Sequence, residues 1–177
     1  MRESVILESP FAANRTLRAC FDWRDDRFGH NIELSDQAGS CLLLCSHEGL
    51  HADNWPLSPP LQQLHREDRG GGHQVVLLVG MSGREHWSSS VEIDPDGRAI
   101  TFDVACRVGT PGAALRSTYR IVSNEWNHDR QQDWELTALE TDQRLAHITS
   151  DDEYVSIVAA TSASRTVRWK YRIVLTK

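Results

Sequence analysis

Two histidines and a glutamate stand close together in residues 42–56, LLLCSHEGLHADNWP. His47 and His51 are four positions apart, and Glu48 directly follows the first of them. On a helix, side chains four positions apart share one face, so both imidazoles could bind one zinc ion and Glu48 could activate a metal-bound water. On a strand the two histidines would lie roughly 13 Å apart, too far for a single ion. The chemistry of this segment therefore depends on its secondary structure.

The spacing is that of the H-E-x-x-H pattern, so these five residues resemble the metal site of the zincin family of metalloproteases. The resemblance implies a zinc-dependent hydrolase in which His47 and His51 hold the metal and Glu48 is the catalytic base. The extended zincin pattern requires Gly at position 54 and His at position 57, where this chain has Asn54 and Leu57. The resemblance therefore covers no more than the five residues of the pattern.

The local sequence favours a strand and a loop here. The apolar run 41–45 is short and shows no helical period, and SDQAGS before it is typical of a hairpin turn. Gly49 would cost a helix up to about 1 kcal/mol relative to alanine, although Ser40 could cap one. We expect a strand at 41–45 and a polar loop at 46–56, with the zinc hydrolase as the alternative. In that alternative a third ligand would come from His65, Glu67 or Glu85.

A second polar group, GMSGREHWSSS at residues 80–90, could bind a ligand or act as a nucleophile. His86 and Ser88 would share one face of a strand, which permits a Ser–His pair. The G-x-S-x-G pattern fails because position 84 is arginine, and alternating polar residues are typical of a solvated sheet face. Arg84 and His86 are therefore weak candidates for ligand binding.

The chain has six tryptophans. Trp55 and Trp126 fall in predicted loops, where an indole serves either as a lid over the end of the fold or as a platform that stacks on a sugar or peptide. The lid is the preferred interpretation. The remaining four fall on apolar strand faces and are predicted to be core residues: Trp23, Trp87, Trp134 and Trp169.

Three charged clusters have simpler interpretations than ligand sites. DPDG at 94–97 and SDDE at 150–153 are typical of solvated turns, because adjacent carboxylates need not converge on one ion. Arg168, Lys170 and Arg172 alternate with apolar residues, which is the pattern of a surface strand and only weakly indicates an anion site.

The elements that carry these residues follow from a period of two in the apolar positions. We expect an all-β, antiparallel barrel or two-sheet sandwich of about ten strands with little helix. Residues 1–177 would form one domain, with 1–14 as a loosely ordered N-terminal segment. The expected strands lie within residues 16–23, 28–34, 41–45, 74–81, 85–94, 98–108, 115–122, 133–140, 153–160 and 165–175. The run at 74–81 is apolar throughout and reads as a strand buried on both faces.

One hairpin can be predicted in detail. DPDG has the residues of a type I turn followed by a position that permits positive φ. A four-residue loop pairs Ile93 with Arg98 and Val91 with Ile100, which places both apolar sets on one side of the sheet. A shift by one residue would separate those sets, so we predict this register.

Composition limits the function classes. The formal charge of −6 argues against nucleic-acid and anionic-membrane binders, which need a basic surface. No apolar run approaches the roughly 18 residues of a membrane span, and the first residues lack a secretory core, so we expect a soluble, cytoplasmic protein. The four cysteines lack C-x-x-C spacing and are predicted to be small buried hydrophobes.

These observations favour a noncatalytic ligand-binding or protein-interaction module without a cofactor. The expected partner is a small molecule, a glycan or a protein, bound where the loops around Trp55 and Trp126 gather. A homo-oligomer is compatible with the sequence. The alternative is the small zinc hydrolase that uses His47, Glu48 and His51.

Overall fold

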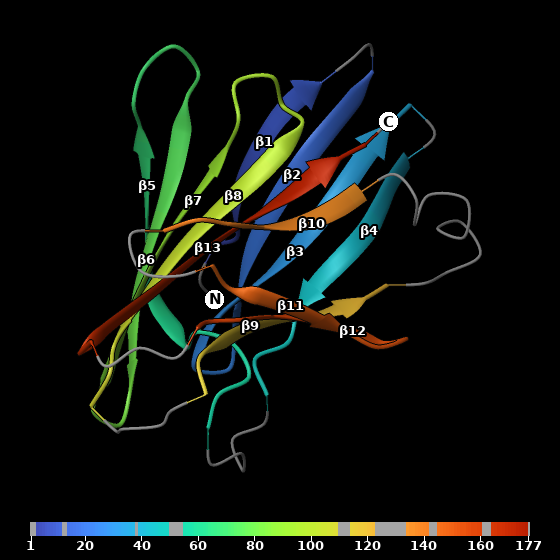
Figure 1. Ribbon diagram of the computed structural model, residues 1–177. Coiled ribbons are helices and arrows are strands. Elements are labelled where there is room, and N and C mark those ends of the chain that lie inside the picture. Colours follow the sequence, from blue (N-terminus) through green and yellow to red (C-terminus); the bar gives the residue numbers. More distant parts are fainter. Residues whose placement is uncertain are drawn as a thin grey trace.

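The computed structural model describes residues 3–11, 14–37, 39–49, 55–109, 114–122, 134–141, 145–160 and 164–176, and these residues contain thirteen strands and no helix (Figure 1). The strands are β1 (Val5–Phe11), β2 (Arg15–Arg24), β3 (Arg27–Asp36), β4 (Gly39–Ser46), β5 (Leu61–Asp68), β6 (Gln74–Ser82), β7 (Glu85–Ile93), β8 (Ala99–Arg107), β9 (Arg116–Ile121), β10 (Trp134–Leu139), β11 (His147–Ser150), β12 (Tyr154–Val158) and β13 (Thr166–Leu175). In this part of the chain, then, no helix is long and apolar enough to cross a membrane.

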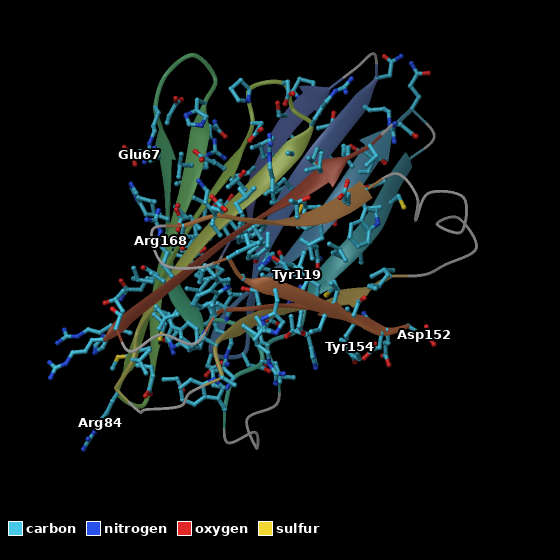
Figure 2. The ribbon with its side chains drawn as sticks, in the orientation of Figure 1. Glu67, Arg84, Tyr119, Asp152, Tyr154 and Arg168 are labelled. Atoms are coloured by element: carbon cyan, nitrogen blue, oxygen red, sulfur yellow. The ribbon has the colours of Figure 1, made fainter. Side chains whose placement is uncertain are left out.

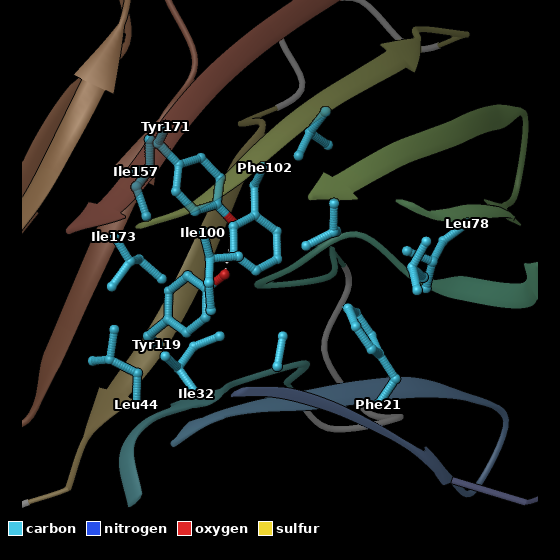
Figure 3. Packing of buried hydrophobic residues seen from close by; sticks show 14 of the residues in the cluster. Phe21, Ile32, Leu44, Leu78, Ile100, Phe102, Tyr119, Ile157, Tyr171 and Ile173 are labelled. Atoms are coloured by element: carbon cyan, nitrogen blue, oxygen red, sulfur yellow. Dashed lines mark hydrogen bonds between the residues drawn. The ribbon is translucent and has the colours of Figure 1, made fainter. Parts of the chain in front are cut away.

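The strands form two antiparallel sheets. A seven-stranded sheet has the order β1-β2-β3-β4-β9-β12-β11, and a six-stranded sheet has the order β10-β13-β8-β7-β6-β5. Buried side chains of both sheets meet in one core (Figure 3). Among the described residues no strand pairing joins the two sheets. The all-β prediction is therefore confirmed, and the architecture is that of a sandwich whose sheets do not close into a barrel.

The alternation of buried and exposed side chains along the strands explains why the strands form two packed layers. In β13 every second side chain is buried, while the residues between them are exposed or half-buried. The buried set consists of Val167, Trp169, Tyr171, Ile173 and Leu175. Because successive side chains of a strand point to opposite faces, this pattern orients one face toward the opposite sheet. The predicted inward face of this strand is confirmed.

Three strands were not expected from the sequence. They are β1, β5 and β11, and each is the terminal strand of its sheet. β1 lies in the N-terminal segment that showed no strand pattern, and it pairs with β2 from Val5↔Phe21 to Phe11↔Arg15. Edge strands are less buried than central ones, so their alternation is weaker and the sequence marks them less clearly.

The β7–β8 hairpin keeps the predicted faces but not the predicted register. The DPDG turn is present, with Gly97 N–H donating to Asp94 O at 2.8 Å and Gly97 at φ +69°. The pairing is Ile93↔Ile100, however, which is two residues away from the prediction. The Asp94 N–H donates to Ala99 O at 2.9 Å, so Asp94 and Ala99 close the loop and Arg98 lies within it. Parity excludes a shift of one residue but cannot detect a shift of two.

Strand β6 is buried on both faces only in its first half, where Val75 on the outer face is 1% exposed, so the interpretation of its apolar run is corrected for the second half. Val76 and Leu78 face the core, but Val79 and Met81 are 47% and 49% exposed on the outer face. The outer face is thus open at Val79 and Met81, in the second half of the strand. The sequence cannot show this because an apolar run looks the same whether or not another element packs on it.

The cysteines and tryptophans are placed largely as predicted. All four cysteines are free; Cys45 is half-buried and the other three are buried. Trp87 and Trp169 are buried in the core, whereas Trp23 and Trp134 are partly buried at its margin.

Candidate functional site

The segment that contains the H-E-x-x-H pattern is strand and irregular chain in its described part. β4 ends at Ser46, and residues 47–49 have no regular structure. The His47 N–H donates to Thr118 O at 2.8 Å, and its ring lies 5.1 Å from that of Tyr154. His51 lies outside the described residues. The helix that would bring two histidines to one metal is absent from residues 39–49.

No group of three or more His, Cys, Asp and Glu side chains suited to a metal ion occurs within the described ranges. His65, Glu67 and Glu85, the third ligands considered for zinc, lie on β5 and at the start of β7 in the six-stranded sheet, whereas His47 follows a strand of the other sheet.

Glu48 takes part in a buried polar cluster. The Ser46 hydroxyl donates to its Oε1, and Arg24 donates to its Oε2 at 3.3 Å. The Ser46 Oγ in turn accepts the backbone N–H of His30 at 2.7 Å. Burial raises the pKa of Glu48, while the bond from Ser46 and the positive charge of Arg24 lower it. Glu48 thus anchors the end of β4 to the β2–β3 hairpin.

Arg24 covers the outer side of this cluster. Besides Glu48 it donates to Ser46 O at 3.2 Å and to Asn31 Oδ1 at 2.8 Å. Its side chain lies across Gly29, where a Cβ would come within 2.7 Å of three of its atoms. The absence of a side chain at Gly29 therefore allows the guanidinium to lie flat on the hairpin.

A chain of hydrogen bonds continues from this hairpin across the core. His30 Nε2 and Tyr119 Oη are 2.8 Å apart. Tyr119 Oη and Tyr171 Oη are 2.6 Å apart (Figure 3). Tyr119 lies on β9 and Tyr171 on β13, so the phenol pair joins the two sheets. Burial, helped by the charge of Arg24, lowers the pKa of His30 to about 3, and burial raises the pKa of both tyrosines. All three groups are therefore uncharged near neutral pH.

The polar cluster borders a small cavity between the sheets. The cavity has a free volume of about 20 Å³, which suffices for one water molecule and not for an organic ligand. Its polar lining residues are His30, Glu48, Ser58, Ser89, Ser117, Tyr119 and Tyr171. We conclude that these side chains have a structural role in the core and do not form a site for an organic ligand.

Residues of the two predicted turns, and of the basic stripe formed by Arg168, Lys170 and Arg172, also form hydrogen bonds or ion pairs within the protein. Asp151 Oδ1 accepts the N–H groups of Glu153 and Tyr154 at 2.9 and 2.7 Å, which lowers its pKa. Arg168 Nε donates to Asp103 Oδ1 at 2.7 Å, and Arg172 forms an ion pair with Asp94. The carboxylates of β8 and its preceding turn thus offset much of the stripe's charge.

Trp55 lies against the end of the core. Its Nε1 donates to Ala114 O at 2.8 Å, and its ring centroid is 6.3 Å from that of Trp87. The ring is partly buried against the core cluster. This position is that of a lid, and Trp126 lies outside the described residues.

Arg84 and His86 belong to the β6–β7 hairpin. Ser82 pairs with Glu85, which leaves Gly83 and Arg84 as a two-residue turn with positive φ at the glycine. Arg84 points away from the protein at the tip of this hairpin (Figure 2). His86 is exposed and pairs with Met81 on β6.

His86 lies at a mainly apolar depression, which we call the Trp87 cleft. The cleft has a free volume of about 310 Å³. Its lining residues are Gln62, Gln63, Val79, Gly80, Met81, His86 and Trp87. It therefore includes one predicted binding residue, His86.

A β-bulge in β5 shapes this cleft. The pairing with β6 shifts between Leu61 and Gln63. The Gln62 side chain forms two hydrogen bonds to the main chain of Met81: it accepts the N–H at 3.0 Å and donates to the carbonyl at 3.2 Å. At Gly80 a Cβ would lie 1.9 Å from Pro60 O, so only glycine permits this close crossing. Bulges of this kind commonly redirect side chains beside binding sites.

Most of the cleft residues could not have been identified from the sequence. Gln62 and Gln63 follow a proline-rich bend without a strand pattern, and Val79 and Met81 belong to a run that indicated full burial. The available signal was the polar cluster around His86, which marked the correct hairpin.

No protein-family model matches this chain, and no curated protein matches it.

Proposed function

We propose that the protein is a noncatalytic binding domain that holds a small, uncharged and largely apolar molecule in the Trp87 cleft. The observation that carries this proposal is the lining of the cleft. Val79 and Met81 supply exposed apolar surface, and Gln63 and His86 supply hydrogen-bonding groups. Small-molecule sites combine such surfaces in volumes of about 300–1,000 Å³, and the cleft lies at the lower end of that range.

The charge of the lining favours a neutral ligand. Among the described residues no carboxylate, lysine or arginine lines the cleft, and Arg84 points away from the protein (Figure 2). A charged ligand would lose hydration against apolar side chains without gaining a counter-charge, which is unfavourable. We therefore expect neutral ligands to bind better than acids or amines of the same shape.

The arrangement of polar groups supports binding more than catalysis. His86 and Ser88 project from the same face of β7, but two residues along a strand separate them by about 7 Å. Nucleophile and base normally lie within hydrogen-bonding distance of each other. The Ser–His alternative therefore gains no support from the strand geometry.

A second cleft of about 340 Å³ is a weaker candidate. It lies between β1 and the turns that follow β5 and β7, and it includes Glu8 and Asp94. These carboxylates already form ion pairs with Arg18 and Arg172. A ligand there would have to compete with those pairs for its polar contacts.

Three probes that share a phenyl ring test the proposal: neutral benzamide, anionic benzoate and cationic benzylamine at pH 7.5. In ¹H–¹⁵N NMR titrations we expect benzamide to shift the amides of β6 and β7 around the cleft, with an affinity in the millimolar range that is usual for small fragments. Benzoate and benzylamine should bind several-fold more weakly, since either would place a charge against apolar side chains.

Met81→Glu should abolish the benzamide shifts by placing a carboxylate in the cleft. The matched control is Leu145→Glu, because Leu145 is 53% exposed and Met81 is 49% exposed, and Leu145 does not line the cleft. The proposal is wrong if no probe shifts the cleft amides, or if Met81→Glu and Leu145→Glu affect binding equally.

A further inference from the structure

Four side chains of the Trp87 cleft form a regular arrangement on the outer face of the six-stranded sheet. Val79 and Met81 are two positions apart on β6, and both are about half-exposed. Gln63 on β5 pairs with Val79, and His86 on β7 pairs with Met81. Because directly paired residues of neighbouring strands share a face, all four side chains project from the same side of the sheet.

The two polar side chains stand at opposite corners of this arrangement. Gln63 and His86 are separated by two strand spacings across the sheet and by two residues along it. Strands lie about 4.8 Å apart and rise about 3.4 Å per residue, so the two Cα positions are about 12 Å apart. Side chains stand roughly perpendicular to a sheet, so the polar ends keep a similar separation. The apolar surface of Val79 and Met81 lies between them.

Both polar side chains can turn to a ligand. The Gln62 side chain also lines the cleft, but it is already bonded to both main-chain groups of Met81. Gln63 and His86, in contrast, form no side-chain hydrogen bond to another residue in the described ranges. The amide of glutamine offers donors and an acceptor, and an uncharged imidazole offers one of each.

This separation of the polar groups selects the length of the ligand. A benzene ring with polar substituents in para positions, with one hydrogen bond of about 2.9 Å at each end, covers about 12 Å. Its ring would lie on Val79 and Met81, where the thioether sulfur makes a favourable contact with an aromatic ring. A ring with one polar substituent reaches only one of the two corners, and meta substituents do not point to opposite corners.

We propose that the Trp87 cleft binds flat, uncharged aromatic molecules that carry a hydrogen-bonding group at each end of their long axis. Gln63 holds one end and His86 holds the other. This inference rests on the proposed function, since it requires a ligand in the cleft. It narrows the ligand class from apolar molecules in general to molecules with two polar ends at a fixed separation.

Two isomers, 4-hydroxybenzamide and 3-hydroxybenzamide, test the inference, because they carry the same groups and differ in the positions of those groups. In NMR titrations of the full chain at pH 7.5 we expect the 4-isomer to bind about five- to tenfold more tightly than benzamide, the effect of one additional hydrogen bond. The 3-isomer should stay within about twofold of benzamide. Saturation with the 4-isomer should shift both the side-chain amide of Gln63 and the imidazole protons of His86.

Gln63→Leu and His86→Leu should each abolish the preference for the 4-isomer over the 3-isomer, while benzamide stays bound through the remaining polar end. Both side chains are exposed, so neither variant disturbs the core. Ser88→Ala is the matched control and should retain the preference. Ser88 is exposed on the same face of β7 as His86 and does not line the cleft.

The outcomes separate this inference from the proposed function. If benzamide binds but the two isomers have equal affinities, or if the preference survives both leucine variants, the inference is overturned while the proposed function stands. If neither isomer nor benzamide shifts the cleft amides, the proposed function itself is overturned, and the inference with it.

Discussion

His30 is an imidazole held without charge inside a ring of aromatic side chains. Phe21, Phe102 and Tyr119 surround it with centroid distances of 5.6, 5.1 and 5.3 Å. A charge on this ring would be poorly solvated and would also face Arg24, so the folded protein resists protonation of His30. The unfolded chain has no such resistance, and stability must therefore depend on pH.

We expect the free energy of unfolding to fall as pH decreases from about 6.5 toward 3. The pKa of His30 is lowered to about 3 in the folded protein, so the unfolded state takes up the proton first. The full contribution of His30 to this pH dependence of the free energy of unfolding is on the order of 3–5 kcal/mol. Because carboxylates titrate in the same window, the measurement is the difference in urea unfolding between wild type and His30→Gln at pH 7 and pH 4.

Wild type should lose stability relative to His30→Gln on acidification. The exposed His86 provides the control, since His86→Gln should leave the pH dependence unchanged. An equal difference between wild type and His30→Gln at both pH values would contradict the prediction.

At the scale of elements, the β5–β6 pair shows how one backbone crossing decides the shape of the cleft. The bulge in β5 brings Pro60 O over Gly80, and Gln62 bonds to both main-chain groups of Met81. Backbone atoms cannot move aside as a side chain can. A methyl group at position 80 must therefore displace the start of β5 itself.

Gly80→Ala should destabilise the protein by about 3 kcal/mol or more, because overpacking against main chain is costly. Gly29→Ala is the matched comparison: its Cβ would meet atoms of the Arg24 side chain, all at 2.7 Å, and that side chain can swing away. We expect a smaller loss there, about 1 kcal/mol. Urea unfolding of both variants tests this, and a loss at Gly29 equal to or greater than that at Gly80 would show that the crossing is not rigid.

At the scale of the whole molecule, the two sheets are joined by packing and by buried hydrogen bonds, among them the Tyr119–Tyr171 phenol pair and the bond from Trp169 Nε1 to Ser117 Oγ. Phe102 stacks on Tyr171 with a centroid distance of 5.0 Å and an interplanar angle of 4°. The Tyr119 hydroxyl lies between His30 and Tyr171 and hydrogen-bonds to both. Removing that hydroxyl leaves two buried polar groups without this partner, whereas removing the Tyr171 hydroxyl leaves the His30 contact intact.

A double-mutant cycle measures this connection. Tyr119→Phe should cost about 1–3 kcal/mol, more than Tyr171→Phe, and the coupling between the two changes should be about 1 kcal/mol. Both variants retain their aromatic rings, so packing changes little. Strictly additive losses in the cycle would mean that the two hydroxyls contribute independently and do not link the sheets.

The amount of structure that the sequence reveals depends on how local the information is. Trp87, Val91 and Ile93 identify the inner face of β7 because side chains alternate along any strand. The register of that strand with β8 does not follow from this alternation, because a shift of two residues keeps the same faces, and the observed loop is closed by the bond from Asp94 N–H to Ala99 O. The HEGLH segment shows the same limit. Its residue types suggest a metal site, but two histidines four positions apart can bind one zinc ion only on a helix. Residues 47–49 are irregular chain after a strand.

By itself, then, the sequence determined the all-β class, the inner and outer faces of the central strands and the turns between neighbours, because a period of two and turn residues act over a few positions. Only the tertiary structure decided the order of strands, the edge strands β1, β5 and β11, and the exposure of Val79 and Met81. These features depend on which distant segments cover a given face or edge. The Trp87 cleft arises from such a meeting, where Pro60 crosses Gly80 beside Val79 and Met81.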